Sequence, residues 1–475
     1  MIYINNDNTK PLYLQIYESI RQNILCGMLL KNTALPPIRT MANELKVSKN
    51  TVEHAYQQLL EEGLIRAVKG SGYYVEDLAK ILLTTTPETT PAQLPKLIPP
   101  SAQNPIRYDF RYSVGDTHLF PWTKWKQCVS NAILDEATLQ FSKYESNKGF
   151  YPLRANLCTF LQRTRGVVCS PDQIVICAGT QYGLETILNL IPNNRKRVAF
   201  EEPGYIGMRK VFYNCRCDVK SVMIQEDGID VDDVTNSPVD MVYLTPSHQF
   251  PTGVTTSLQK RYRLLEWARQ NNGYIIENDY DSEFSYGHRI LPSLQSLDQN
   301  ERVIYLGTLS KALFPSIRCA YYVLPPSLMK LYEKKYKHYN SALPTFVQKA
   351  ITEFIKDGLL EKHIRKISSM NERKFRRLIQ YLEQNLPDQV HMIYDPAGSH
   401  LLLQVDCCQQ ESELIAFMKE RSIGIHGTKK NWAGTESPDN VFLVGFSSIS
   451  EEKIEKYAAI LTVALHEYIE TKQKS

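Results

Sequence analysis

The sequence predicts an α/β protein made of two folded units of unequal size and a tether between them. Three observations lead to this prediction. The first 76 residues show the periodicity of short helices followed by a hairpin. Residues 77–107 are rich in threonine and proline and have little apolar surface to bury. Over residues 108–475, strand-like apolar runs alternate with amphipathic segments, which is typical of a mostly parallel sheet flanked by helices.

Composition excludes several classes of protein. Of the 475 residues, 43% are hydrophobic and 22% are charged, which is unlike collagen-like or wholly disordered chains. No run approaches the roughly 20 apolar residues of a spanning helix, and the N-terminus does not resemble a secretory signal. We therefore expect a cytoplasmic protein without membrane contact. The ten cysteines show no metal-ligand spacing, so we expect no metal site.

Net charge does not by itself indicate a nucleic-acid ligand. The chain has 55 Lys and Arg against 51 Asp and Glu, and residues 1–77 contain eight of each sign. Attraction to DNA must therefore come from the local placement of basic side chains. Because that attraction is modest, useful affinity is expected to require two copies acting together.

The N-terminal unit is predicted to contain three helices and a hairpin. The first helix follows Pro11 and the second follows Pro37, because proline is tolerated at helix starts. Ser48 is a good N-cap for the third helix, and Gly63 ends it. Two strand-like runs within residues 64–75 are joined by a glycine-rich turn. This order of elements is typical of a winged helix-turn-helix.

Polar and basic side chains occupy the first turn of the third helix, where a recognition helix contacts phosphates and base edges. A basic residue that opens the second helix and the turn of the hairpin extend the same surface. The predicted DNA-binding residues are Arg39, Ser48, Lys49, Asn50, Thr51, Lys69, Gly70, Ser71 and Gly72. Periodicity alone leaves a second interpretation open, a small helical protein–protein module.

Six segments of this unit resemble the GntR-type DNA-binding domain. They are residues 11–17, 35–39, 47–52, 55–59, 63–65 and 70–73. The family usually has serine where this chain has Pro37, and often arginine where it has Lys49. The resemblance implies that the unit binds double-stranded operator DNA.

Three polar clusters of the large unit follow buried strand-like runs, at the edge where parallel sheets bind ligands. Residues 179–181 lie at a strand-to-helix junction, where free N–H groups suit a phosphate. Residues 277–284 are acidic and aromatic and are expected directly after a strand. In residues 308–318, Lys311 lies beside two hydroxyls and Arg318 follows seven residues later. A lysine in this setting can form a Schiff base while hydroxyls and a guanidinium hold a phosphate.

These clusters together resemble the fold-type-I aminotransferases and their pyridoxal 5′-phosphate site. Residues 144–154, 202–205 and 246–253 fit the same pattern, and nearly all of residues 108–465 is covered. The order of a GntR-like domain, a proline-rich tether and an aminotransferase-like domain resembles the MocR/GabR family of transcriptional regulators. The resemblance implies a homodimer. It also implies a type I pyridoxal-phosphate-dependent transferase fold with a smaller C-terminal α+β subdomain.

The resemblance also implies residue roles. Lys311 would carry the cofactor as a Schiff base, Tyr205 would stack on its ring, and Tyr280 would bind the ring hydroxyl. The other predicted cofactor-binding residues are Thr180, Gln181, His248, Asn278, Asp279, Thr308, Ser310 and Arg318. The sequence leaves open which of Asn278 and Asp279 faces the pyridine nitrogen.

Two departures from the aminotransferase pattern favour sensing over turnover. The aspartate that pairs with the ring nitrogen matches Asn278, which cannot hold that nitrogen protonated as a carboxylate does. Residues 441–446 lack the carboxylate-binding arginine of many transaminases, which leaves Lys429 and Lys430 as nearby basic candidates. We therefore expect a regulator that senses an amine, an amino acid or pyridoxal phosphate itself, with weak or partial transamination at most. The alternatives are an active aminotransferase and a regulator that no longer binds the cofactor.

Overall fold

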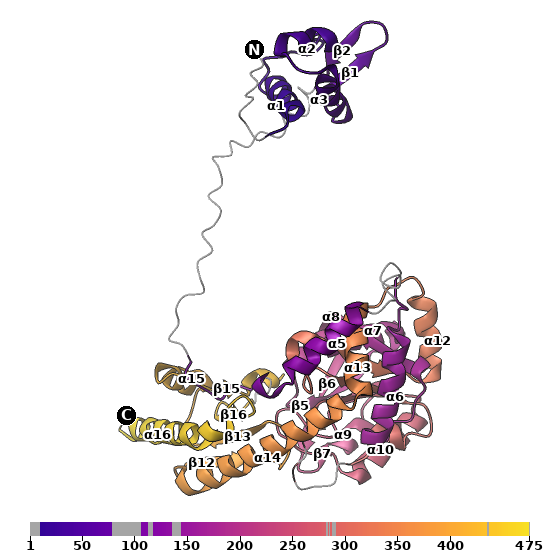
Figure 1. Ribbon diagram of the computed structural model, residues 1–475. Coiled ribbons are helices and arrows are strands. Elements are labelled where there is room, and N and C mark those ends of the chain that lie inside the picture. Colours follow the sequence, from indigo (N-terminus) through magenta and orange to yellow (C-terminus); the bar gives the residue numbers. More distant parts are fainter. Residues whose placement is uncertain are drawn as a thin grey trace. The chain divides into compact units, whose positions relative to one another are not determined.

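The chain divides into two compact units between residues 101 and 102 (Figure 1). The computed structural model describes residues 10–77, 106–112, 117–134, 144–281, 284, 286, 291–434 and 437–474. Most of the predicted tether, residues 78–105, lies outside the described residues. Each unit has the fold class that the sequence predicts, and each is described by itself below.

The small unit contains the predicted helices and hairpin in the predicted order. Its elements are α1 (Leu12–Leu25), α2 (Ile38–Leu45), α3 (Lys49–Glu61), β1 (Ile65–Val68) and β2 (Gly72–Val75). The apolar faces of α1 and α3 meet around Ile16, Val52 and Leu59, which are fully buried. Gly72 was expected in the hairpin turn, but it pairs with Val68 as the first residue of β2. The winged helix-turn-helix is confirmed.

The first turn of α3 is fixed by the predicted N-cap. Ser48 has extended backbone, and its Oγ accepts a hydrogen bond from Thr51 N at 3.2 Å. Lys46 adopts a left-handed conformation with φ of 53°, which turns the chain between α2 and α3. These contacts orient the exposed side chains at the start of α3.

Replacing Ser48 with alanine is expected to lower the free energy of unfolding of the small unit by about 1 kcal/mol, because the N–H group of Thr51 loses the side-chain acceptor of the N-cap. Hydrogen exchange of the amides in α3, measured on the full chain at increasing denaturant concentration, reports this change. Ser48→Thr retains a capping hydroxyl and serves as the control. Equal protection of α3 in the alanine variant and the wild type would contradict the assignment of the cap.

The large unit is built on an eight-stranded sheet with the strand order β4-β11-β10-β9-β8-β5-β6-β7. Its strands are β4 (Ile174–Cys177), β5 (Arg197–Glu202), β6 (Asp218–Gln225), β7 (Gly228–Ile229), β8 (Met241–Leu244), β9 (Tyr274–Asp279), β10 (Val303–Thr308) and β11 (Ala320–Val323). The neighbours from β10 to β6 pair in parallel, whereas β11 and β7 run antiparallel to the strands beside them. The predicted mostly parallel sheet is confirmed.

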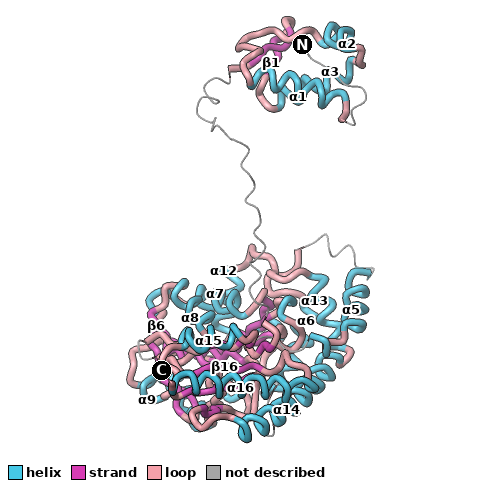
Figure 2. The backbone as a smooth tube through the Cα atoms, turned by 90° about the vertical axis from the view of Figure 1, so that its left-hand side faces the viewer, coloured by secondary structure: helices cyan, strands magenta, loops and turns pink. Residues whose placement is uncertain are grey.

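Helices cover both faces of this sheet, so that the strands lie between two helical layers (Figure 2). The helices that share a core with one face are α5 (Trp122–Leu134), α6 (Tyr151–Arg165), α9 (Val231–Thr235), α10 (Leu258–Gln270), α11 (Leu294–Leu297) and α13 (Thr345–Lys356). Those on the other face are α7 (Thr180–Leu190), α8 (Ile206–Asn214) and α12 (Pro326–Lys335). Burial on both faces explains why the strands appear in the sequence as continuous apolar runs.

A smaller C-terminal subdomain contains a second, antiparallel sheet with the order β12-β13-β16-β15. Its strands are β12 (Val390–Ile393), β13 (His400–Val405), β15 (His426–Gly427) and β16 (Val441–Gly445), and its helices are α14 (Leu359–Asn385), α15 (Glu411–Glu420) and α16 (Ile454–Gln473). In addition, β14 (Ile423–Gly424) pairs with β3 (Tyr108–Asp109) from the beginning of the large unit. The predicted α+β subdomain is confirmed.

Three further features bear on function. All ten cysteines are free thiols. Among the described residues, no three His, Cys, Asp or Glu side chains gather as ligands of a metal ion would. None of the helices in the described parts of the chain is both long and apolar enough to cross a bilayer.

Candidate functional site

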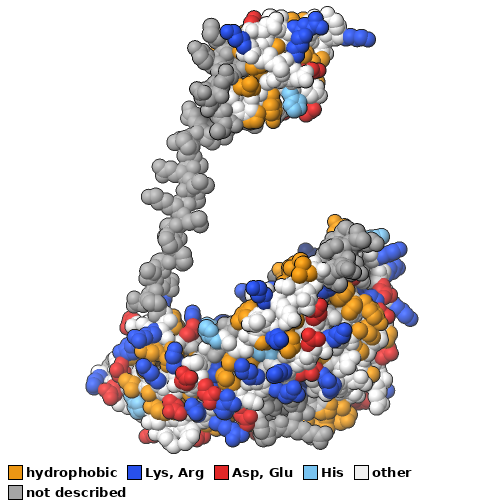
Figure 3. Space-filling view, viewed as in Figure 1, with side chains coloured by type: hydrophobic (Ala, Val, Ile, Leu, Met, Phe, Trp, Pro, Cys, Tyr) orange, Lys and Arg blue, Asp and Glu red, His pale blue; other side chains and the backbone are white. Residues whose placement is uncertain are grey.

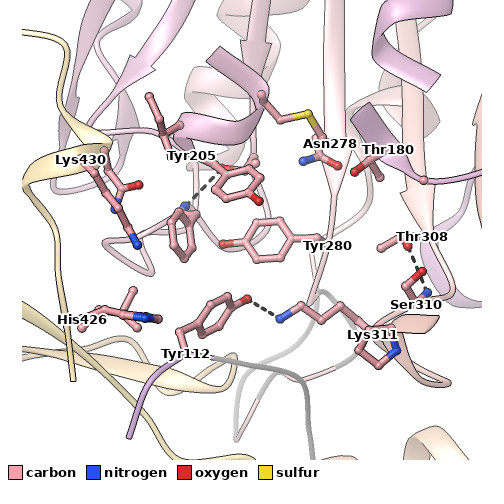
Figure 4. A pocket seen from close by; sticks show the side chains of 18 of the residues that line it. Tyr112, Thr180, Tyr205, Asn278, Tyr280, Thr308, Ser310, Lys311, His426 and Lys430 are labelled. Atoms are coloured by element: carbon pink, nitrogen blue, oxygen red, sulfur yellow. Dashed lines mark hydrogen bonds between the residues drawn. The ribbon is translucent and has the colours of Figure 1, made fainter. Parts of the chain in front are cut away.

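A cavity of about 540 Å³ lies in the large unit at the carboxyl ends of its parallel strands. Its wall combines the ends of β9 and β10, the beginning of α7 and parts of the C-terminal subdomain. Eight of the predicted site residues line it: Thr180, Tyr205, Asn278, Tyr280, Thr308, Ser310, Lys311 and Arg318 (Figure 4). The structure thus brings together residues from three clusters that are far apart in the sequence.

One end of the cavity is arranged to bind an anion. Helix α7 begins at Thr180, so the N–H groups of its first turn have no acceptor within the helix. Ser310 Oγ is buried and has no hydrogen-bond partner among the described residues. Arg318 Nη2 lies 3.3 Å from the carbonyl oxygen of Ala178. A Cβ atom on Gly179 would lie only 2.4 Å from Arg318 Nη2, so glycine is needed for the guanidinium to approach α7.

Lys311 extends into the cavity toward the phenol of Tyr112 (Figure 4), and a carboxylate lies close to its amino group. Its Nζ lies 2.5 Å from Tyr112 Oη and 3.5 Å from Asp281 Oδ1. Tyr112 Oη also donates to Asp281 Oδ2 at 3.1 Å, and Ser399 Oγ donates to the same oxygen at 3.3 Å. This network fixes the position of the Lys311 amino group.

The protonation states of this network follow from burial and charge. Burial, followed by the neighbouring Asp281, raises the pKa of Tyr112 well above its usual value, so the phenol remains a hydrogen-bond donor. Burial opposes ionisation of Asp281, but the positive charge of Lys311, together with the hydrogen bond from Tyr112, favours the carboxylate, and the pKa of Asp281 is lowered. Near neutral pH, Lys311 therefore faces a protonated phenol and an ionised carboxylate.

Asn278 and Asp279 are consecutive residues of β9 and point to opposite faces of the sheet, because side chains alternate along a strand. Asn278 lines the cavity, and its Nδ2 donates to Tyr243 Oη at 2.8 Å. Its buried Oδ1 has no partner within the described part of the chain. Asp279 accepts hydrogen bonds on the other face from Arg165 Nε at 2.6 Å and Tyr305 Oη at 2.5 Å. Of the two residues that the sequence left open, only Asn278 lies at the cavity.

Two other predicted residues do not place their side chains at the cavity. The exposed side chain of Gln181 donates to the carbonyl of Gly207 at 3.2 Å, although its backbone N–H belongs to the first turn of α7. His248 is buried next to Tyr280 and His400, and burial lowers its pKa. Neither ring nitrogen of His248 has a hydrogen-bond partner among the described residues.

The position of the acidic and aromatic cluster also needs correction. Residues 277–284 were expected directly after a strand, but β9 continues through Asp279. Glu277 is a strand residue whose carboxylate accepts hydrogen bonds from the N–H groups of Leu294 and Gln295 at the beginning of α11. Polar side chains can lie within this strand because each has a buried partner. Ser282 and Glu283 lie outside the described residues.

Sequence reasoning missed several residues of the cavity wall. Tyr112 lies 199 positions from Lys311 and gives no local signal of its contact with that lysine. Asp281 belongs to the predicted acidic cluster but was assigned no role. Phe250, His426 and Asn431 also line the cavity. Sequence motifs did not reveal these residues because loops and the C-terminal subdomain bring them to the site.

The predicted DNA-binding residues form an accessible surface on the small unit. Eight of the nine are exposed, and Thr51 is half-buried. Basic side chains gather along the edge of this unit that carries the hairpin (Figure 3). Gly70 in the hairpin turn and Gly72 at the beginning of β2 have φ of 80° and 113°. Such angles are easily adopted only by glycine and keep the turn slim.

Comparison with known families accounts for both units. Residues 12–75 match the model of the gntR family of bacterial regulatory proteins, and residues 112–458 match the model of aminotransferase class I and II. An HTH-type transcriptional regulator of Bacillus subtilis, YdeL, is 32% identical over 453 residues, which cover 95% of this chain and 96% of the relative. The regulatory protein MocR of Rhizobium meliloti is 31% identical over 415 residues, which cover 85% of this chain and 83% of the relative.

Solved structures support the fold of the large unit. The kynurenine aminotransferase of Pyrococcus horikoshii superposes with a TM-score of 0.68 at 23% identity, covering 76% of this chain and 91% of that structure. The α-aminoadipate aminotransferase LysN of Thermus thermophilus superposes with a TM-score of 0.68 at 22% identity, covering 77% of this chain and 93% of that structure. At this identity, the likeness establishes the aminotransferase fold of the unit.

Proposed function

The chain belongs to the MocR/GabR family of GntR-type transcriptional regulators with an aminotransferase class I and II domain, and we propose that it couples amine binding at Lys311 to DNA binding. The helix-turn-helix unit makes it a DNA-binding regulator, and the aminotransferase fold implies pyridoxal phosphate as its cofactor. The observation that carries the proposal is the position of Lys311 in one cavity with two other features. One is the anion cradle, the end of the cavity formed by the first turn of α7, Ser310 and Arg318. The other is a set of buried polar atoms that have no partner among the described residues.

The residues of the cavity fit pyridoxal phosphate. Ser310 Oγ, Tyr280 Oη and Asn278 Oδ1 are buried and lack partners among the described residues, which is costly unless a ligand pairs with them. The first turn of α7, Ser310 and Arg318 would hold the phosphate, and Tyr205, Tyr280 and Asn278 would surround the ring. When bound, the cofactor supplies an aldehyde that condenses with primary amines and a ring that withdraws electrons.

The residues around Lys311 are suited to amine exchange. Tyr112 Oη accepts a hydrogen bond from Lys311 Nζ and donates one to Asp281. With the cofactor bound, Tyr112 and Asp281 would hold the Lys311 amino group close to it through the same two contacts. An amine that enters the cavity would therefore compete with an amino group that stays nearby.

The cavity also suggests how binding reaches the DNA. Lys311 belongs to the part of the large unit that contains the eight-stranded sheet, whereas His426 and Lys430 belong to the C-terminal subdomain, and all three line the cavity. A ligand in contact with both parts stabilises one arrangement of them. Its effect on DNA affinity is limited to the difference in its affinity for the two arrangements, typically about 1–3 kcal/mol.

We also propose a homodimer, which would present two winged helices to two half-sites. Large apolar side chains of the large unit are strongly exposed: Leu134 is 77% exposed, Tyr144 87% and Tyr182 59%. Exposed apolar side chains of this size favour a protein–protein contact. Sedimentation of the full chain measures the oligomeric state.

The test of the proposed function combines cofactor and operator binding. Full-length protein loaded with pyridoxal phosphate should absorb in the visible, an amine should change this spectrum, and the same amine should change operator affinity. An active aminotransferase is the alternative, for which conversion of a keto acid at about 1 per second or faster would be the sign. A spectrum that responds while operator affinity stays constant would contradict the coupling.

Replacing Arg39 or Lys49 with alanine is expected to weaken operator binding without changing the visible spectrum of the cofactor. Each side chain is exposed on the predicted DNA surface. A lost phosphate contact lowers the steepness of the plot of log affinity against log salt concentration by about one. Gel-shift titrations at several salt concentrations measure both quantities. Lys31→Ala, which removes an equal charge from an ion pair with Asp77, is the control. Unchanged affinity in both variants would count against this surface.

A further inference from the structure

We propose that Cys158 and Cys169 are a modification site, at which a small-molecule disulfide such as oxidised glutathione closes an intramolecular disulfide bond. Neither cysteine lines the cavity that contains Lys311, so this inference stands apart from the proposed function. The new bond would join α6 to the segment that leads into β4.

The two sulfur atoms are already in contact. Cys158 lies in α6, and Cys169 lies between the end of this helix and a short 3-10 helix (Pro171–Gln173). Cys169 Sγ donates a hydrogen bond to Cys158 Sγ at 3.8 Å, and Cys158 Sγ donates to the carbonyl oxygen of Cys169 at 2.8 Å. Among the described residues, no other two cysteine side chains are hydrogen-bonded to each other.

A short movement separates this contact from a covalent bond. The sulfur atoms of a disulfide lie about 2.0 Å apart, so the two Sγ atoms, now 3.8 Å apart, must approach by roughly 1.8 Å. Rotation about the Cα–Cβ bonds moves both sulfurs, and residues 166–170 form no helix or strand that would hold Cys169 in place. Because both cysteines are half-buried, a small oxidant can reach them from solvent.

Burial sets the order in which the two thiols react. Burial, followed by the neighbouring Cys158, raises the pKa of Cys169 to about 12, so Cys169 stays protonated near neutral pH. Cys158 therefore attacks a sulfur of the oxidant, forms a mixed disulfide and releases one small thiol, which takes up the Cys158 proton through solvent. Cys169 then attacks Cys158 Sγ, and the second small thiol leaves with the Cys169 proton. In total, two cysteine thiols are oxidised and one small-molecule disulfide is reduced to two thiols.

The disulfide would close a loop that contains Arg165. This buried side chain donates to Asp279 Oδ2 at 2.6 Å and to Ser247 Oγ at 2.6 Å, so it joins α6 to the end of β9. A cross-link around Arg165 reduces the number of open conformations available to residues 166–170. The oxidised chain should therefore open less often at this loop, and its amides should exchange hydrogen more slowly.

The experiment maps the disulfide in the full-length chain. The protein is incubated with oxidised glutathione, its remaining thiols are alkylated, and a tryptic digest is analysed without reduction. Trypsin places Cys158 in the peptide of residues 155–163 and Cys169 in that of residues 166–195. We expect these two peptides to be joined after oxidation and separate before it. Fragmentation of the joined pair distinguishes Cys169 from Cys177, which lies in the same peptide.

Serine variants test the order of the reaction. Cys169→Ser should stop at the mixed disulfide, so that Cys158 carries glutathione. Cys158→Ser lacks the attacking thiol, and its Cys169 should remain a free thiol. Cys26→Ser removes an exposed thiol of the small unit and should form the bond as the wild type does.

Hydrogen exchange measures the effect of the bond on the loop. Oxidation of the wild type should slow exchange of the amides in residues 166–170 by about tenfold or more. The same treatment should leave exchange unchanged in Cys158→Ser, in which the bond cannot form. This comparison separates the effect of the cross-link from other effects of the oxidant.

Three results would overturn the inference. The first is a wild-type protein in which Cys26 carries glutathione, so that the oxidant has reacted, while Cys158 and Cys169 remain free thiols. The second is a glutathione on each of the two cysteines, or a disulfide from either of them to a different cysteine. The third is a disulfide between Cys158 and Cys169 that leaves exchange at residues 166–170 unchanged, which would refute the restraint on the loop around Arg165.

Discussion

The Lys311→Ala protein is expected to hold no covalently attached cofactor and to lose its response to amines. Lys311 is the lysine whose amino group the structure fixes in the cavity, through Tyr112 at 2.5 Å and Asp281 at 3.5 Å. Alanine removes the amino group that condenses with the cofactor aldehyde. The anion cradle remains, so some reversible binding through the phosphate can persist, but the visible absorption of the attached cofactor should disappear.

Mass spectrometry after borohydride reduction measures this effect directly. The wild-type chain should show an adduct on the peptide that contains Lys311, and the Lys311→Ala chain should show none. Lys430→Ala removes another lysine from the same cavity wall and should retain the adduct. Gel shifts with operator DNA should show that Lys311→Ala still binds DNA, but without a change on adding an amine. An adduct on a different lysine of the wild type would refute the assignment of Lys311.

Sequence patterns predicted the architecture because each unit has strong local signals. The helices of the small unit have clear apolar periodicity, and Ser48 and Gly63 mark the ends of α3 as expected. In the large unit, polar clusters follow or end the buried strands and meet at one edge of the sheet, as parallel topology requires. Lys311, Ser310 and Thr180 were therefore placed together correctly at the level of the cavity.

The residues that were misplaced or missed depend on packing between distant segments. Tyr112 reaches Lys311 because β3 pairs with β14, a contact between segments more than 300 residues apart. Asn431 lies at the cavity because the C-terminal subdomain folds against the larger sheet. No local pattern encodes either contact. In contrast, the separation of Asn278 from Asp279 follows from a local pattern, because side chains alternate along β9 and this strand continues past Ile276 to Asp279.

Asn278→Asp is expected to raise the rate of transamination by about a hundredfold, the scale of a single well-placed electrostatic contact in an active site. Asn278 Oδ1 lies at the cavity without a partner among the described residues. A carboxylate at this position favours a positive charge on the pyridine nitrogen, whereas the amide does not. A protonated ring withdraws electrons more strongly, and this is the property that transamination requires.

The surroundings of Asn278 can accept a carboxylate. Aspartate has nearly the same shape, and Tyr243 Oη, at 2.8 Å from Nδ2, can donate a hydrogen bond to it. Burial raises the pKa of the neighbouring Glu201 to about 7, with Thr245 and Gln249 hydrogen-bonded to that carboxyl group. Glu201 is thus partly neutral near pH 7, which limits its repulsion of a second carboxylate.

The rate at which a keto acid is converted measures this gain in wild type, Asn278→Asp and Asn278→Ala. Asn278→Ala removes the amide without adding charge and should turn over no faster than the wild type. A second readout is the pH at which the visible spectrum of the bound cofactor changes. In Asn278→Asp this pH should rise, because the carboxylate stabilises the protonated ring. If the Asp variant binds the cofactor but neither the rate nor this pH changes, then Asn278 does not contact the ring nitrogen, and the weakness of transamination must have another cause.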